Sequence, residues 1–124
     1  MSILADQHRK TCGRVGEEIA KQFLVDRHYD IMATNFHSRY GEIDIVAIKN
    51  GITYFCEVKA RTTLTFGTPE EAVNWKKLHK IKKTIQCYID EHGYTPWQID
   101  IIAIYLSPKL KPLKITHYKN IPSS

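Results

Sequence analysis

The sequence has few cysteines and no long apolar segment. Cys12, Cys56 and Cys87 are widely spaced and form no Cys-x-x-Cys pair, which argues against a disulfide framework and against a zinc site. We expect them to be small apolar residues in a reduced cytoplasm. No apolar run approaches the roughly 20 residues of a membrane span, and the N-terminus lacks the apolar core of a signal peptide. We therefore expect a cytoplasmic protein with no membrane partner.

Internal repeats and low-complexity segments are also absent, so we expect the 124 residues to form one domain with a single core. Hydrophobic residues make up 43% of the chain and charged residues 25%, which is typical of a globular protein. The net charge of +5 permits binding to nucleic acid without establishing it. Residues 1–10 show no clear pattern, and we expect them to be flexible.

The most informative stretch is residues 41–59, in which two apolar, β-branched runs flank Asn50-Gly51. This dipeptide is the strongest local signal for a two-residue hairpin turn, because both central residues must accept a positive φ. With this dipeptide as the loop, Asp44 is expected directly opposite Glu57. Lys59 follows Glu57 by two residues, so the alternation of a strand places it on the same face.

Two opposed carboxylates would be costly there, since like charges repel and both faces of this hairpin are otherwise apolar. A divalent cation held between Asp44 and Glu57 would remove the repulsion and bind their oxygens. The alternative is a structural ion pair at the strand ends, between Lys59 and either Glu57 or Asp44. The pattern favours the metal site and leaves the ion pair open.

Residues 12–27 carry a helical pattern, with Thr11 as the expected N-cap and apolar residues in one stripe. Gly13 and Gly16 fall inside this stripe. Glycine costs about 1 kcal/mol in a helix, and here we expect it to let the helix approach a sheet closely. Glu17 lies at the edge of the stripe, where it is either a first-turn glutamate favoured by the helix dipole or a residue of the functional site.

The remaining elements complete an α/β domain. Strands are expected over residues 29–36, 97–105 and 113–118. A second helix is expected to start at Thr68-Pro69, where it can break near Asn74, and to end at about His92. Together with the hairpin, these elements predict a single domain with one mixed β-sheet of about five strands and helices packed against it.

Several basic residues indicate where a nucleic acid would bind. Arg39 lies in the polar loop before the hairpin, and Arg61 continues the face of Lys59 if that strand persists. Lys77 lies at the flank of the apolar stripe of the second helix. The polar side of that helix carries a basic cluster of Lys76, His79, Lys80 and Lys83. This cluster is either a solvated face or a phosphate-binding one.

Five motifs, taken in order, resemble the YraN-like family of predicted endonucleases. They are Arg14-Val15-Gly16-Glu17, Gly41-Glu42-Ile43-Asp44, Glu57-Val58-Lys59-Ala60-Arg61, Phe66-Gly67 and Ile99-Asp100-Ile101. Asp44 followed by Glu57-Val58-Lys59 is similar to the signature of PD-(D/E)XK nucleases. The YraN-like family itself is distantly similar to archaeal Holliday-junction resolvases. The chain departs from the family pattern at Ala60, where a hydroxyl residue is usual. The motifs are specific in combination and unspecific singly.

The resemblance implies a restriction-endonuclease-like core and a nuclease that uses Mg²⁺ or Mn²⁺ on structured or branched DNA. Asp44 and Glu57 would bind the metal, and Glu17 would be a further ligand, directly or through water. Lys59 would orient or activate the attacking water, or offset charge on the phosphate. Arg61 and Lys77 would hold the scissile phosphate or a neighbouring one. Lys76, Lys80 and Arg39 are further candidates for nucleic-acid contact, by their charge and position alone.

Two other functions stay open at this point. One is a nucleic-acid-binding module of the same fold that cleaves nothing, and the other is an adaptor that binds a protein. For Asp100, a structural hydrogen-bond acceptor is a better interpretation than a metal ligand, and Glu42 has no assigned role. The sequence does not separate DNA from RNA, endonuclease from exonuclease, or a monomer from a homodimer.

Overall fold

The computed structural model describes residues 3–62 and 75–122. Its elements are α1 (Ile3–Asp26), β1 (Asp30–Ser38), β2 (Gly41–Lys49), β3 (Ile52–Thr62), α2 (Trp75–His92), β4 (Trp97–Leu106) and β5 (Pro112–Tyr118). The strands form one sheet in the order β1-β2-β3-β4-β5, in which β3 and β4 are parallel and the other neighbours antiparallel. A parallel pair needs a crossover connection, and α2 lies in it. The predicted α/β domain with a mixed five-stranded sheet is confirmed.

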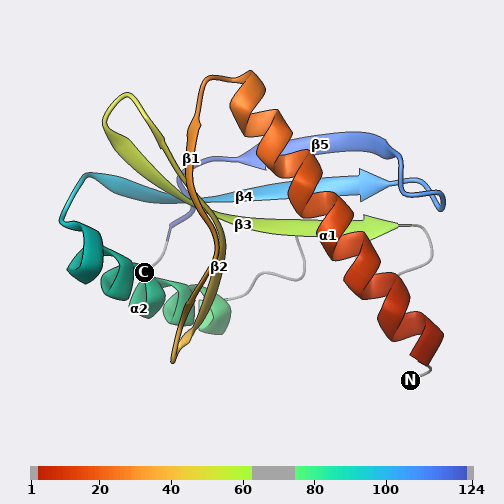
Figure 1. The fold of residues 1–124 in the computed structure, drawn as a ribbon, viewed down its shortest axis with the longest axis horizontal. Coiled ribbons are helices and arrows are strands. Elements are labelled where there is room, and N and C mark those ends of the chain that lie inside the picture. Colours follow the sequence, from red (N-terminus) through yellow and green to blue (C-terminus); the bar gives the residue numbers. More distant parts are fainter. Residues whose placement is uncertain (1–2, 63–74, 123–124) are drawn as a thin grey trace.

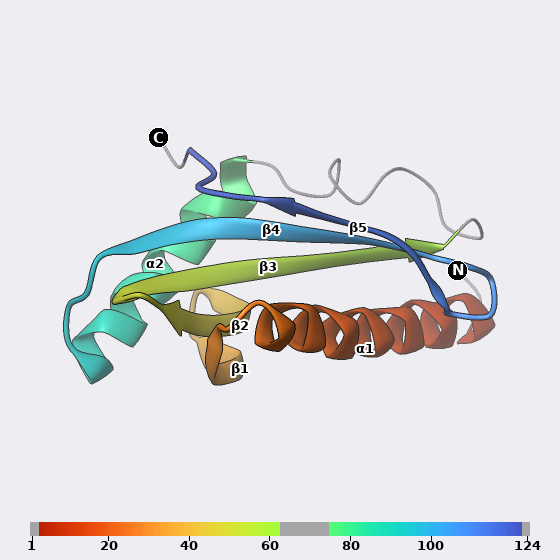
Figure 2. The same ribbon diagram turned by 90° about the horizontal axis from the view of Figure 1, so that it is seen from above.

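Alternate residues of the central strands pack against different helices. Ile45 on β2 and Cys56 on β3 belong to a buried cluster with α1, whereas their neighbours Val46 and Phe55 belong to a cluster with α2. In Figure 1, α1 runs diagonally across β3, β4 and β5, while α2 lies toward the end of the sheet where β1 and β2 are found. Figure 2 shows α1 running alongside β3. The hairpin is therefore a central pair that is buried on both faces, as its sequence predicted.

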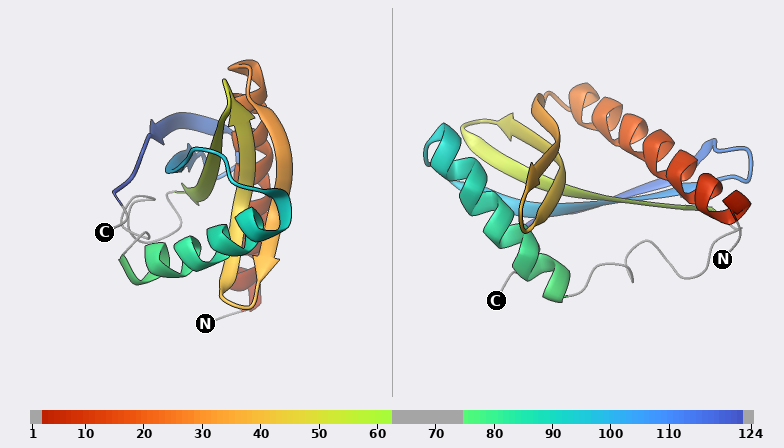
Figure 3. Two further views of the ribbon diagram at one scale, coloured as in Figure 1. Left: turned by 90° about the vertical axis from the view of Figure 1, so that its left-hand side faces the viewer. Right: turned by 60° about the horizontal axis from the view of Figure 1, so that its bottom comes forward.

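The turn at Asn50-Gly51 has the predicted conformation. Both residues have positive φ, 52° for Asn50 and 77° for Gly51, and Lys49 pairs with Ile52. The pairing then continues in the predicted register as far as Ile45 and Cys56, where the ladder between β2 and β3 ends. Beyond this point β2 stays paired with β1, and the β1–β2 hairpin turns across the direction of β3 and β4 (Figure 3).

The first helix is longer than predicted. It begins at Ile3 rather than at Cys12, so Thr11 is not an N-cap. Its hydroxyl instead donates a hydrogen bond to the carbonyl of Gln7, one turn earlier in the same helix. The apolar residues of the added segment, Ile3 and Leu4, are 75% and 76% exposed, so the segment carries no apolar stripe that would have revealed a helix.

The two glycines of α1 differ in their surroundings. A Cβ added to Gly16 would collide with the Cβ of Ala60 on β3, which confirms the predicted close approach of helix and sheet. A Cβ added to Gly13 would meet no atom within 4 Å, so the same prediction is wrong for Gly13. Gly16 therefore fixes how closely α1 lies on β3, and Gly13 needs another explanation.

The second helix ends as predicted at His92, where Gly93 has a φ of 93° and its amide donates to the carbonyl of Ile89. Its predicted start at Thr68-Pro69, the break near Asn74 and the Phe66-Gly67 motif lie outside the described residues. The predicted strands agree with β1, β4 and β5 to within two residues at each end. In the described ranges no helix is long and apolar enough to cross a membrane.

Candidate active site

The candidate site begins where β2 leaves β3. The amide of Val58, one residue beyond Glu57, donates a hydrogen bond of 2.7 Å to Oδ2 of Asp44. This side-chain contact stands beyond the last backbone pair of the two strands, Ile45 with Cys56. The prediction that Asp44 and Glu57 form a directly opposed pair is therefore wrong. The ladder ends one pair too early, and Asp44 reaches β3 through its carboxylate.

The early end of the ladder coincides with a bend in the neighbouring strand. Asn35 of β1 lies between the residues paired with Ile45 and Ile43, across from Asp44, and has a φ of 51°. A residue in this conformation interrupts the extended backbone, so β1 and β2 turn together away from β3. The fork between β2 and β3 exposes an edge at which side chains from several elements can meet.

Glu57 is held by two lysines. Its side chain is 6% exposed, and Oε1 lies 3.2 Å from Nζ of Lys59 and 2.9 Å from Nζ of Lys77. Lys59 comes from the same strand two residues later, as predicted, and Lys77 comes from the first turns of α2. The structural ion pair that the sequence left open is thus present, with a second lysine added to it.

The charges of the site perturb one another. Burial, followed by repulsion from Glu57, raises the pKa of Asp44 to about 7, although the Val58 amide and Lys59 act in the opposite direction. The repulsion predicted between the two acids is thus the second cause of this shift, after burial. Burial and the neighbouring Lys77 lower the pKa of Lys59, although Glu57 opposes this change. Burial also acts to lower the pKa of Lys77, but attraction to Glu57 outweighs it and the pKa is raised.

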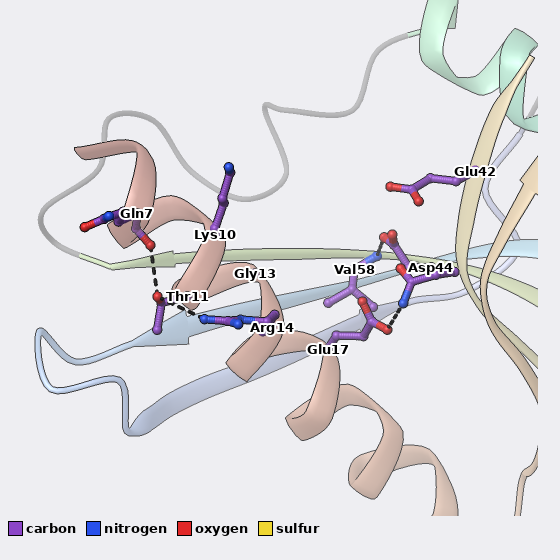
Figure 4. A pocket seen from close by; sticks show the side chains of 10 residues that line it. Gln7, Lys10, Thr11, Gly13, Arg14, Glu17, Glu42, Asp44 and Val58 are labelled. Atoms are coloured by element: carbon purple, nitrogen blue, oxygen red, sulfur yellow. Dashed lines mark hydrogen bonds between the residues drawn. The ribbon is translucent and has the colours of Figure 1, made fainter. Parts of the chain in front are cut away.

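Asp44 lines a cavity of about 740 Å³ between α1 and the sheet. Glu17 and Glu42 line the same cavity, so three carboxylates gather at one end of it (Figure 4). Asn35 donates a hydrogen bond of 2.8 Å to Oε1 of Glu17, which orients the glutamate from α1 toward the sheet. The prediction that Glu17 approaches the site from the first helix agrees with this position.

A smaller cavity of about 150 Å³ adjoins Glu57 on the α2 side. Its lining includes Glu57, Lys77 and Lys80, together with Tyr40 from the turn between β1 and β2. Glu42 lines both cavities. Asp44 therefore faces the larger cavity and Glu57 the smaller one, with Glu42 common to the two linings.

Other predicted nucleic-acid contacts lie around this fork. Arg61 follows Lys59 on β3, which persists to Thr62, and its guanidinium donates to the carbonyl of Ala60. Arg39 donates to the hydroxyl of Tyr40 and lies 4.9 Å from that ring, and Tyr40 lines the smaller cavity. Lys76 is exposed on α2. The fold thus brings Lys77 and Lys80 to the site, and it leaves Lys76 on the surface beside it.

Asp100 is fully buried and lies in a separate network. It accepts hydrogen bonds from the side chains of Gln98 and His117 and from the amide of Asn120, at 2.8–2.9 Å. Burial would raise its pKa, but these three hydrogen bonds outweigh burial and lower it. This agrees with the interpretation of Asp100 as a structural acceptor that ties β5 and the following residues to β4.

The donor set of the site suits a hard cation. All candidate ligands are carboxylates, and Mg²⁺ prefers oxygen ligands. Within residues 3–62 and 75–122, however, no group of three His, Cys, Asp or Glu side chains lies close enough to hold a metal ion. Mg²⁺ usually takes only one or two carboxylates from a protein and completes its shell with water and phosphate. A cation held by one or two of these carboxylates would need water or phosphate to complete its shell.

Sequence reasoning missed two contributors to the site. Glu42 precedes Asp44 by two residues, and strand alternation could have assigned both to one face. Asn35 gave no such signal, because its contact with Glu17 joins residues 18 positions apart through the packing of α1 on β1.

Comparisons with known proteins agree with the motifs. Residues 16–104 match the model of a family described as uncharacterised protein family UPF0102. A UPF0102 protein from Caldanaerobacter subterraneus subsp. tengcongensis is 43% identical over 116 residues, which cover 91% of this chain and 95% of the relative. A UPF0102 protein from Caldicellulosiruptor bescii is 40% identical, with 90% and 96% covered, and one from Nocardia farcinica is 37% identical, with 91% and 90% covered.

Proposed function

We propose that this chain, which belongs to the uncharacterised protein family UPF0102, is a metal-dependent nuclease that hydrolyses phosphodiester bonds in DNA. The observation that carries the proposal is the convergence of Asp44, Glu57 and Lys59 at the fork between β2 and β3. A buried glutamate and a partly buried aspartate and lysine are costly to bring together without a use. The preference for structured or branched DNA rests on the family resemblance, since no residue of the site reads a base.

In this proposal the acids hold a divalent cation, Mg²⁺ or Mn²⁺. Asp44 and Glu57 would be direct ligands, and Glu17, oriented by Asn35, would bind directly or through water. When bound, such an ion lowers the pKa of a coordinated water and neutralises charge on the phosphate. Glu42 lines both cavities and is a further oxygen donor at the same edge.

Lys59 would act on the attacking water or on the phosphate. Burial and Lys77 lower its pKa, so it loses its proton more readily than an exposed lysine, and in its neutral form it could accept a proton from the attacking water. In its charged form it can instead offset charge on the phosphate. Lys77 and Arg61 flank it from α2 and β3 and would hold the phosphate groups around the cleaved bond.

A second candidate function is a nucleic-acid-binding module that cleaves nothing. It is favoured by the two ion pairs of Glu57, because Lys59 and Lys77 balance this carboxylate without a metal. An adaptor that binds a protein has no such observation in its favour.

The test is incubation of the protein with duplex, single-stranded, flapped and four-way-junction DNA, with Mg²⁺, Mn²⁺ or EDTA. The nuclease proposal predicts cleavage of at least one substrate with metal and none with EDTA. Lys59→Met should bind the same substrate but cleave it more slowly, and Lys21→Ala, on the far part of α1, should cleave like the wild type. Binding without cleavage under every condition would favour the inactive module.

A further inference from the structure

The larger cavity continues along α1 well beyond the three carboxylates. The polar lining residues of this helix recur every three or four positions, which is the spacing of one helical face. They are Gln7, Lys10, Thr11, Arg14 and Glu17. Ten residues of helix span about 15 Å, so the cavity is a groove that runs beside β3 for nearly three turns. We call it the α1 groove.

Charge changes sign along the α1 groove. Its inner end, at the fork, carries the carboxylates of Glu17, Glu42 and Asp44, and its outer end carries Lys10 and Arg14 (Figure 4). Both basic residues are exposed, and in the described part of the chain no carboxylate forms an ion pair with either of them. The outer end is therefore a positively charged surface that a phosphate could occupy.

Arg14 is positioned by its own helix. Its Nη2 donates a hydrogen bond of 3.4 Å to Oγ1 of Thr11, and Thr11 is itself fixed by its bond to the carbonyl of Gln7. The contact uses one of the five N–H groups of the guanidinium, so the others can bind phosphate oxygens in a fork.

Gly13 adds no side chain to the α1 groove. It lines the groove, has no packing neighbour at the position of a Cβ, and lies in a helix, where glycine is unfavourable. Gly16, three residues later, holds the helix against Ala60. One glycine thus sets the distance between α1 and β3, and the other leaves the groove without a side chain.

We propose that the α1 groove is a binding site for the DNA strand next to the cleaved bond, with Arg14 and Lys10 on its phosphates. The inference rests on the proposed function, which places the scissile phosphate at the carboxylate end. The order of charges fits this direction, because a cation balances the inner end and the strand's own phosphates balance the outer end. The groove's volume of about 740 Å³ lies within the range of ligand-binding pockets.

The first test measures the salt dependence of binding. Fluorescence anisotropy of a labelled single-stranded oligonucleotide, in EDTA and at a series of KCl concentrations, gives the slope of log K against log salt. Loss of one phosphate contact should make this negative slope shallower by about 0.7 for single strands. Arg14→Ala and Lys10→Ala should each show this reduction. Lys21→Ala, which removes one charge from the same helix outside the groove, should not.

The second test fills the groove. Gly13→Ala adds one methyl group in open space and should bind like the wild type, whereas Gly13→Trp should weaken binding by about tenfold or more. Circular dichroism of both variants checks that α1 still folds. If folded Gly13→Trp and Arg14→Ala both keep the wild-type affinity and salt slope, the groove is not the path of the strand.

The two proposals fail in different ways. Binding in EDTA does not depend on cleavage, so reduced slopes in a protein that cleaves nothing would support the groove and contradict the nuclease. Wild-type cleavage with Mg²⁺, together with unchanged binding and cleavage by the groove variants, would support the nuclease and contradict the groove.

Discussion

Nζ of Lys77 lies 2.9 Å from Oε1 of Glu57, so α2 places a cation on a carboxylate of β3 that is also a candidate metal ligand. A divalent ion and Lys77 would therefore compete for Glu57. A phosphate that draws Lys77 away would make the carboxylate available. This relationship links the binding of nucleic acid to the binding of metal at the same site.

The first prediction follows from this competition. Lys77→Met should bind Mn²⁺ more tightly than the wild type in the absence of DNA, because Glu57 is balanced by Lys59 alone. The same variant should bind DNA more weakly, with a salt slope lower by about 0.7 to 0.9. Isothermal titration with Mn²⁺ measures the first effect. Lys76→Met, at a neighbouring exposed lysine, is the control for the Mn²⁺ titration, and equal Mn²⁺ affinity in all three proteins would contradict the competition.

The second prediction compares one substitution at two positions of α1. Gly16→Ala should destabilise the protein by about 1–3 kcal/mol, since its Cβ meets that of Ala60 and the helix must move from β3. Gly13→Ala should stabilise it by about 0.5–1 kcal/mol, because nothing obstructs the methyl group and alanine favours the helix. Urea unfolding of both variants measures whether each substitution raises or lowers the free energy of unfolding. A stabilised Gly16→Ala protein would show that the helix does not lie as close to β3 as described.

The third prediction concerns acid. Hydrogen bonds from His117, Asn120 and Gln98 lower the pKa of Asp100 below its ordinary value of 3.8. The unfolded chain then binds this proton more readily than the folded one, so the contribution of Asp100 is present above about pH 4 and is lost as the pH falls below it. Asp100→Asn should be less stable than the wild type near neutral pH, by about 1–3 kcal/mol. The difference should shrink in acid, as measured by urea unfolding at several pH values.

A difference that stays constant between neutral and acidic pH would mean that the charge of Asp100 contributes nothing. His92→Gln serves as the control for the acid series, because His92 lies in the C-terminal turn of α2, away from Asp100, and contacts the carbonyl and the ring of Tyr88.

The fourth prediction concerns Asp44 and metal. Burial and Glu57 raise the pKa of Asp44 to about 7, so the folded state binds this proton more tightly than the unfolded state. The resulting penalty grows as the pH rises from about 4 to 7 and is complete above that range. Asp44→Asn removes the charge and keeps an oxygen for the amide of Val58, so near pH 8 it should be no less stable than the wild type. Mg²⁺ should raise the melting temperature of the wild type but not of the variant.

A structural ion pair predicts the reverse of this result. Asp44→Asn would then be less stable than the wild type at about pH 8, and Mg²⁺ would change neither melting temperature.

Local signals predicted much of the fold. The positive φ required at Asn50 and Gly51 defined the turn, and the turn defined the register as far as Ile45. The two-residue spacing predicted that Glu57 and Lys59 share a face, and the ion pair that was the alternative to a metal site is formed there. These relationships involve neighbours in sequence or across a tight turn, where strand geometry alone determines which side chains meet.

The features that local patterns did not predict depend on distant parts of the chain. Whether Asp44 opposes Glu57 depends on the bend of β1 at Asn35, which no pattern in β2 or β3 reveals. The start of α1 was missed because its first turns bury little apolar surface. Lys77 was selected from a family pattern, but its contact with Glu57 depends on how α2 packs against the sheet.

The central claim is that Asp44 serves metal-dependent cleavage of DNA. The most direct measurement is the cleavage rate of one labelled branched DNA by the wild type and by Asp44→Asn, with Mg²⁺ or Mn²⁺, alongside binding of the same DNA in EDTA. The account predicts that the variant loses about 100-fold or more in rate while its binding in EDTA is kept or improved. Equal cleavage rates in the two proteins, or no cleavage by the wild type of any substrate with either metal, would contradict it.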